Sequence, residues 1–150
     1  MITIVQRVLE ANVTVAGEVV GAIGQGLLAL TAVVKGDGQR EIDWMAGKLA
    51  GLRIFRSEDG HKHFERDIRQ IGGSILLVSN FTVSASTQKG RRPSLDRAAD
   101  PSDAEALFAR LVDAVRAQQV PVETGKFAAD MKVSLVNDGP ATFILDTAAT

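Results

Sequence analysis

Ser79–Thr82 reads Ser-Asn-Phe-Thr and gathers two hydroxyls and one carboxamide within four residues. These residues lie toward the end of the strand predicted for Ser74–Val83, where its apolar side chains give way to polar ones. Polar groups at such a strand end often serve active sites, because the sheet holds them rigidly. The alternative is a strand-end cap whose hydroxyls bond the local backbone. The candidate catalytic residues are Ser79, Asn80, Phe81 and Thr82.

A second candidate is Asn137–Thr142, which reads Asn-Asp-Gly-Pro-Ala-Thr. Alternating apolar residues on either side predict two strands, and the Asn, Asp, Gly and Pro between them favour a hairpin turn. The alternative is a ligand-binding role for Gly139-Pro140. Gly139 has no side chain and Pro140 has no amide hydrogen, so this dipeptide can present bare backbone carbonyls.

A third candidate is the predicted loop Gln88–Arg97, which is rich in basic residues. Such a loop beside a polar strand end can hold phosphates; the alternative is a solvated loop. A net charge of −1 and a pI of about 6.1 argue against a broad nucleic-acid-binding surface, although a local basic patch fits both values. The basic side chains are Lys89, Arg91, Arg92 and Arg97.

Other kinds of chemistry have little support. There is no cysteine, and we find no G-x-S-x-G, Ser-His-Asp, P-loop or G-x-G-x-x-G signature. His61, His63 and Glu65 would share one face of a strand and could there bind a metal, but no fourth ligand is evident. We interpret these histidines as solvated, and we expect no metal and no cofactor.

The elements that position these candidates predict an α/β fold. A length of 150 residues with 45% hydrophobic content indicates one domain, residues 1–150, with its own core. Strands are expected near Ile2–Ile4, Val13–Val15, Val19-Val20, Leu27–Val34, Arg53–Phe55, Val120–Glu123 and Met131–Val136, with a turn at Gly17-Glu18. Leu27–Val34 is apolar on both faces, as in a strand covered on both sides.

Two helices are predicted. Asp37 is expected to cap the first, and Asp100 with Pro101 to begin the second. The apolar stripe of the first is Ile42, Met45, Leu49 and Leu52; that of the second is Ala104, Leu107, Phe108, Leu111, Val112 and Val115. The N-terminus lacks a signal-peptide layout, and the longest apolar run is too short to span a bilayer. We expect a cytoplasmic protein with no membrane partner.

Three stretches together resemble the D-aminoacyl-tRNA deacylases: Gln6–Val8, Ser79–Val83 and Thr124–Thr142. The likeness extends over nearly the whole chain and includes Gly17–Leu28 and Arg91–Ser94. The family's first motif is usually Ser-Gln-Phe-Thr-Leu, in which Asn80 and Val83 are substitutions here. Its second motif is usually Asn-x-Gly-Pro-Val-Thr, which this chain matches at Asn137, Gly139, Pro140 and Thr142, with Ala141 in place of Val.

The resemblance implies a single compact sheet-rich domain, a layered β-β-α sandwich or a barrel-like form, with two main helices. It implies a homodimer that hydrolyses the ester of D-aminoacyl-tRNA, and of Gly-tRNA mischarged on tRNA for alanine, as proofreading in translation. It also implies that the Gly139-Pro140 bond is cis and reaches into the partner's active site. The implied substrate-binding residues are Gly139, Pro140, Asn137, Thr142 and Arg7; the implied tRNA-binding residues are Lys89, Arg91 and Arg92.

The physical chemistry of an aminoacyl ester agrees with a site that has no triad. The ester is already activated, and backbone amides near Phe81 and Thr82 can stabilise an oxyanion. A ribose hydroxyl of the substrate can assist the attacking water. Thr82 either positions the substrate or acts as nucleophile; no base to activate it is evident, which favours positioning. The alternative function is a tRNA-binding module without turnover, for which Asn80 is the hint.

Overall fold

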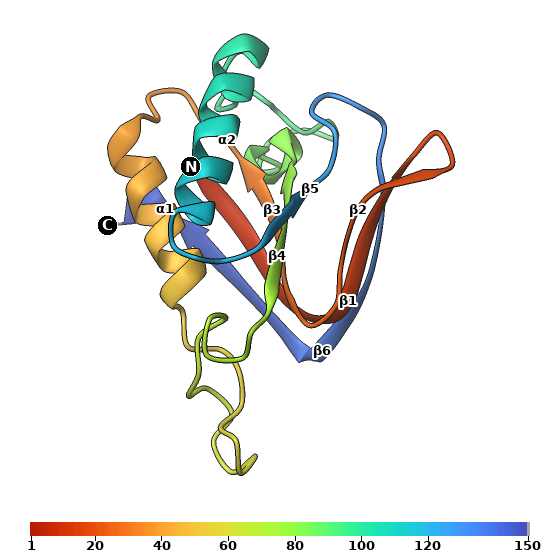
Figure 1. Ribbon diagram of the computed structural model, residues 1–150. Helices are drawn as coiled ribbons and strands as arrows, with labels where there is room; N and C mark the ends of the chain where they lie inside the picture. The colour runs from red at the N-terminus through yellow and green to blue at the C-terminus, as the bar shows by residue number, and fades with distance from the viewer. Residues whose placement is uncertain (150) are drawn as a thin grey trace.

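In the computed structural model, which describes residues 1–149, one strongly curved sheet carries two helices on one side (Figure 1). The long strand β1 (Ile2–Val15) pairs antiparallel with β2 (Glu18–Ile23), β3 (Gly26–Ala32) and β6 (Lys132–Asp146). Strands β4 (Ser74–Ser79) and β5 (Val122–Thr124) extend the sheet in parallel from β3. This confirms the predicted α/β class and its barrel-like form.

The curvature brings β2 back toward β5, so that the sheet nearly closes. A Cβ atom placed on Gly21 of β2 would lie 2.3 Å from the backbone oxygen of Thr124 in β5. Only glycine fits such an approach. The space enclosed by the sheet is filled by an apolar cluster, whose buried members are Val8, Ala11, Val13, Ile23, Leu28, Leu76 and Val78.

The two helices, α1 (Gln39–Gly51) and α2 (Pro101–Arg116), cover the other face of the sheet. Each buries the stripe that helical spacing predicts: Ile42, Met45 and Leu49 in α1, and Phe108, Leu111, Val112 and Val115 in α2. Strands β3 and β4 lie between the two clusters and are buried on both faces. Within the described residues, neither helix is long and apolar enough to cross a membrane.

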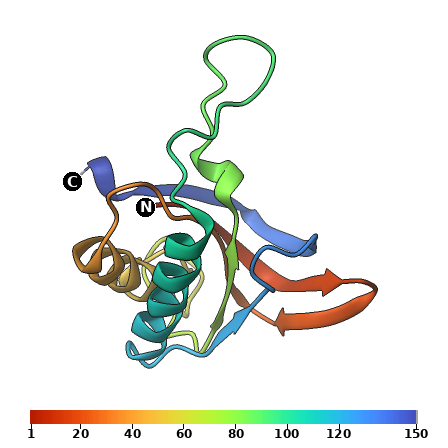
Figure 2. The same ribbon diagram turned by 90° about the horizontal axis from the view of Figure 1, so that it is seen from above.

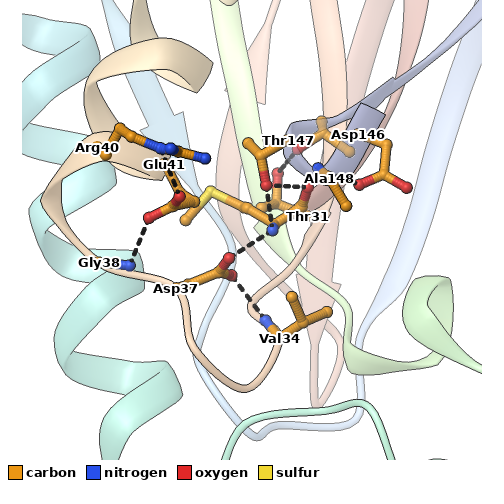
Figure 3. Close-up of polar contacts among 11 residues, drawn as sticks. Thr31, Val34, Asp37, Gly38, Arg40, Glu41, Asp146, Thr147 and Ala148 are labelled. Carbon is orange, nitrogen blue, oxygen red and sulfur yellow. Dashed lines mark hydrogen bonds and ion pairs between the residues drawn. The ribbon is translucent and has the colours of Figure 1, made fainter. Parts of the chain in front are cut away.

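Asp37 does not cap α1, contrary to the prediction. Gly38 occupies the N-cap position, and its amide donates to Glu41 Oε2 at 2.9 Å. Asp37 instead accepts hydrogen bonds from the Met1 ammonium at 2.6 Å and from the Val34 amide at 2.7 Å (Figure 3). The Met1 ammonium is buried and also donates to Thr147 Oγ1 at 2.7 Å. This buried ion pair ties the start of β1 to the loop before α1.

Two predicted strands differ from the observed ones. β4 ends at Ser79, and Phe81–Ser84 forms a short 3-10 helix, because Asn80 turns its side chain back onto the chain. Arg53–Phe55 contributes only one isolated bridge, between Phe55 and Arg66, because the polar segment that follows offers no second strand to extend it.

The predicted hairpin turn at Asn137–Thr142 is wrong. Residues on both sides belong to the single strand β6, which runs antiparallel to β1 along almost its whole length. The pairing passes from Gln6↔Thr142 directly to Val8↔Asn137. Residues 138–141 are therefore looped out as a bulge in a continuous strand, which we call the β6 bulge. A turn between two strands and a bulge within one strand have the same local composition.

Candidate active site

The polar strand end is held on the sheet and folds into a tight turn. The Asn80 amide donates to the Thr31 carbonyl at 2.8 Å, which continues the β3–β4 pairing past Ser79. Asn80 Oδ1 then accepts from Thr82 Oγ1 at 2.6 Å and from the Thr82 amide at 3.3 Å. Ser84, which is buried, bonds the Phe81 carbonyl at 2.8 Å and closes the turn. Thr82 and Phe81 remain exposed.

This strand end opens onto a cavity of about 730 Å³. Ser79, Asn80 and Phe81 lie on its wall, and most of the remaining lining is apolar. The other walls come from β3, from the segment before α2, from the first turn of α2 and from the loop before β6. The apolar lining includes Leu30, Val33, Val78, Leu95, Phe127, Met131 and Val133. The cavity volume lies within the range of small-molecule binding sites, about 300–1,000 Å³.

The β6 bulge lies opposite Arg7 and is held by two side chains. Arg7 is 3% exposed, and its Nε donates to the Asp138 carbonyl at 3.0 Å while its Nη1 donates to the Ile54 carbonyl at 2.6 Å. Asn137 spans the neck of the bulge: its Oδ1 accepts from the Ala141 amide at 3.0 Å and its Nδ2 donates to Thr142 Oγ1 at 3.0 Å.

The backbone of the bulge fits its composition. Gly139 has a φ of 134°, a region that L-residues with side chains rarely adopt. The Gly139-Pro140 peptide bond is cis, in agreement with the expectation. Both residues are exposed. The guanidinium of Arg7, by contrast, is committed to backbone carbonyls inside the chain, so Arg7 supports the bulge from beneath.

The two candidate motifs do not share one cavity within a single chain. For the residues described here, the lining of the 730 Å³ cavity includes Ser79, Asn80 and Phe81 but neither Gly139 nor Pro140. Exposed apolar side chains instead lie around the bulge: Val136 and Ile144 on β6, Leu9 on β1, and Phe64, whose ring makes an edge contact with Phe143 at a centroid distance of 5.9 Å.

The basic loop stands away from the body of the protein, as Figure 2 shows for the segment between β4 and α2. An isolated bridge between Ser86 and Ser94 forms its neck. Lys89, Arg91 and Arg92 lie beyond the neck and are exposed, and none of them is in a recorded ion pair within residues 1–149. Arg97 lies outside the neck, where its carbonyl accepts from the Lys35 amide.

The histidine segment forms no cluster of metal-binding side chains. His61 and His63 are exposed, and His63 Nδ1 lies 2.9 Å from Arg56 Nη1. In the described part of the chain, no three His, Cys, Asp or Glu side chains gather closely enough to hold a metal ion.

Sequence reasoning missed the part of the cavity wall that comes from the loop before β6. Phe127 and Met131 lie in the loop before β6 and line the same cavity as the strand end. Their signal was Phe127, a large aromatic in a short segment outside every expected strand and helix, whereas Met131 was expected to begin the strand Met131–Val136. Only the fold brings this segment beside Ser79–Phe81, which lies more than forty residues earlier in the chain.

Comparison of the fold defines its class. A solved structure described as a probable eukaryotic D-amino acid tRNA deacylase matches with a TM-score of 0.83 at 16% identity, and covers 96% of this chain and 97% of that chain. A second, the c-Myc DNA Unwinding Element Binding Protein, matches with a TM-score of 0.92 at 35% identity and covers 98% and 99%. The fold is therefore that of the D-amino acid tRNA deacylases.

Comparison of the sequence is more specific. The family model for D-Tyr-tRNA(Tyr) deacylase matches residues 4–146. A D-aminoacyl-tRNA deacylase of Geobacter sulfurreducens is 52% identical over 98% of this chain and 95% of its own length. One of Alteromonas mediterranea is 54% identical over 95% and 97%. The chain belongs to the D-Tyr-tRNA(Tyr) deacylase family, which confirms the resemblance seen in its motifs.

Proposed function

We propose that this protein hydrolyses the ester bond of D-aminoacyl-tRNA, and of Gly-tRNA mischarged on tRNA for alanine, and spares L-aminoacyl-tRNA. The observation that carries the proposal is the polar strand end, whose Ser79, Asn80 and Phe81 line an apolar cavity, in a chain that belongs to this family. The products are the free amino acid and tRNA, and the reaction clears mischarged tRNA in the cytoplasm, where translation uses it.

The cavity supports binding of the terminal adenosine of tRNA. An adenine ring is flat and largely apolar on its faces, and Phe127, Met131 and Leu95 offer it apolar contacts. With the base held there, the ribose and its ester lie toward Asn80 and Phe81 at the polar end of the cavity. The ester then meets the backbone amides of the 3-10 turn, which stabilise the oxyanion that forms during attack.

No strong base is required at this site. The ester is activated, and a ribose hydroxyl of the substrate can orient the attacking water. Thr82 is proposed to hold the substrate, with Ser79 supporting the turn, and no covalent acyl-enzyme is formed. We propose no metal in the reaction, so activity should withstand EDTA.

Chiral selection is proposed to depend on a second copy of the chain. Gly139 and Pro140, at the tip of the β6 bulge, are exposed and have exposed apolar side chains beside them, which favours burial against a partner. In the proposed homodimer, Gly139 and Pro140 enter the partner's site and form a wall of backbone atoms, with Asn137, Thr142 and Arg7 as its support. Such a wall excludes an L-side chain by volume and admits glycine and D-residues alike.

The basic loop is proposed to bind the tRNA backbone. Lys89, Arg91 and Arg92 project together, so contact with phosphates would weaken as salt rises. Changing Arg91 and Arg92 together to Gln should raise the KM for tRNA and leave hydrolysis of a short aminoacyl-adenosine unchanged. Arg53 and Arg110, which are exposed and lie outside the loop, serve as the charge-matched control when both are changed together to Gln.

The decisive experiment compares D-Tyr-tRNA, L-Tyr-tRNA and Gly-tRNA as substrates and follows loss of the ester. We expect hydrolysis of the D-form and of Gly-tRNA, with the L-form stable. Equal turnover of the D- and L-forms would contradict the chiral filter. Tight tRNA binding with no turnover of any ester would indicate the binding module instead.

A further inference from the structure

The side chain of Asn80 holds Thr82 by two hydrogen bonds, one to its hydroxyl and one to its backbone amide. The backbone of Asn80 is fixed to the sheet by its bond to the Thr31 carbonyl, so its side chain starts from a rigid point. Its Oδ1 accepts the Thr82 hydroxyl at 2.6 Å and the Thr82 amide at 3.3 Å. Thr82 is exposed, so without this contact its hydroxyl would be free to rotate.

The direction of this hydrogen bond determines what Thr82 can do. A threonine hydroxyl has one proton and two acceptor lone pairs. A carboxamide oxygen can only accept, so the proton of Thr82 points to Asn80. The hydroxyl therefore presents lone pairs to its other neighbours. A carboxamide is also not a base at neutral pH, so this partner cannot activate Thr82 as a nucleophile.

We propose that Asn80 is a positioning residue for the deacylation, which fixes the rotamer of Thr82 and turns its hydroxyl into a hydrogen-bond acceptor for the substrate. This inference rests on the proposed function. It also explains the substitution in the motif: a side chain one methylene shorter than Gln has the length that bonds an amide two residues ahead. Asn80 then supports turnover, whereas the binding-module alternative treats it as a sign of lost activity.

The kinetic test is a double-mutant cycle with Asn80→Ala and Thr82→Val, assayed on D-Tyr-tRNA. Val keeps the shape of Thr and removes the hydroxyl. Each single variant should lower kcat about tenfold, the effect of one ordinary hydrogen bond, and leave KM nearly unchanged. The double variant should be no slower than the slower single one. Effects that multiply, or an Asn80→Ala enzyme at full rate, would overturn the proposal.

A second measurement needs no substrate, so it separates this inference from the proposed function. Three-bond couplings to the Thr82 methyl carbon report its χ1 rotamer by NMR. We expect a single rotamer in the unaltered protein and averaging in Asn80→Ala. Averaging already present in the unaltered protein would refute the positioning role even if the enzyme were active. If the unaltered protein has a single Thr82 rotamer and Asn80→Ala loses it, the positioning contact is upheld. If the unaltered protein then hydrolyses none of the esters, that result contradicts only the proposed function.

Asn12→Ala is the matched control. Asn12 lies in β1, where it pairs with Ala22 and Ser134 at a distance from the strand end of β4. Its change should leave both kcat and the Thr82 couplings unaltered. A fall in kcat for this variant equal to that of Asn80→Ala would show that the loss reflects general destabilisation and would count against the proposal.

Discussion

Arg7 is the residue whose removal should do most damage to the β6 bulge, and Arg7→Met is the test. Met keeps the unbranched stem and removes the charged head. In the structure that head donates to the Ile54 and Asp138 carbonyls and lies 3.3 Å from the Asp138 carboxylate. The bond to the Ile54 carbonyl is buried and the bond to the Asp138 carbonyl is only partly buried, so water can replace the second but not the first.

The expected magnitude follows from these contacts. A hydrogen bond to a charged group contributes about 1.5–3 kcal/mol, and the bond to Ile54 is buried. The bond to Asp138 is partly replaced by water, so we take it at about 1 kcal/mol. Arg7→Met should therefore lower the free energy of unfolding by about 3 kcal/mol, measured by urea denaturation at pH 7. Amide exchange at Ala141, inside the bulge, should accelerate.

Arg53→Met is the control, because Arg53 is exposed and is in no recorded ion pair in the described residues. Its effect should stay within about 0.5 kcal/mol. If Arg7→Met also cost less than 1 kcal/mol, or left exchange at Ala141 unchanged, then Arg7 would not be what holds the bulge.

Three further changes test other contacts. Asp37→Asn leaves the buried Met1 ammonium without a charged partner and should cost about 3 kcal/mol in the same urea assay. Gly139→Ala forces a Cβ to within 2.9 Å of Arg7 Nη2 at a φ of 134°, and should cost about 1–3 kcal/mol while lowering turnover of D-Tyr-tRNA. The pKa of Glu41 lies below its ordinary value of 4.5, because the carboxylate accepts hydrogen bonds from the backbone amides of Glu41 and Gly38. The ionised carboxylate therefore stabilises the fold at pH values above 4.5. This stabilisation is lost as the pH falls through the lower pKa of the folded state. The stability gap between Glu41→Gln and the unaltered protein should thus be largest at neutral pH and shrink in acid.

The helices could be predicted because their signals are local. Apolar residues every three or four positions, together with Pro101 at a helix start, predicted where α2 begins and which face it buries, almost without knowledge of the rest of the chain. The strand end at Ser79–Thr82 was recognised for a similar reason, since the change from apolar to polar residues is visible within ten positions.

The bulge and the cavity could not be predicted in the same way. The composition of Asn137–Thr142 fits a turn, and only the presence of β1 alongside both flanks makes it a bulge. Asp37 likewise looked like a cap until the fold brought the Met1 ammonium beside it. The cavity draws its walls from β3, β4, α2 and the loop before β6, so no single window of sequence contains it.

A bulge and a hairpin turn differ in how they respond to insertions and deletions. A loop that joins two strands can gain or lose residues at its tip, and each strand keeps its own pairing. The β6 bulge lies between two halves of one strand, both of which are in register with β1. One residue added to either half would turn the side chains of that half to the opposite face of the sheet, exchanging its buried and exposed sets. The two paired halves of β6 are therefore fixed in length by β1, and an insertion or deletion that keeps both registers is confined to the looped-out residues 138–141.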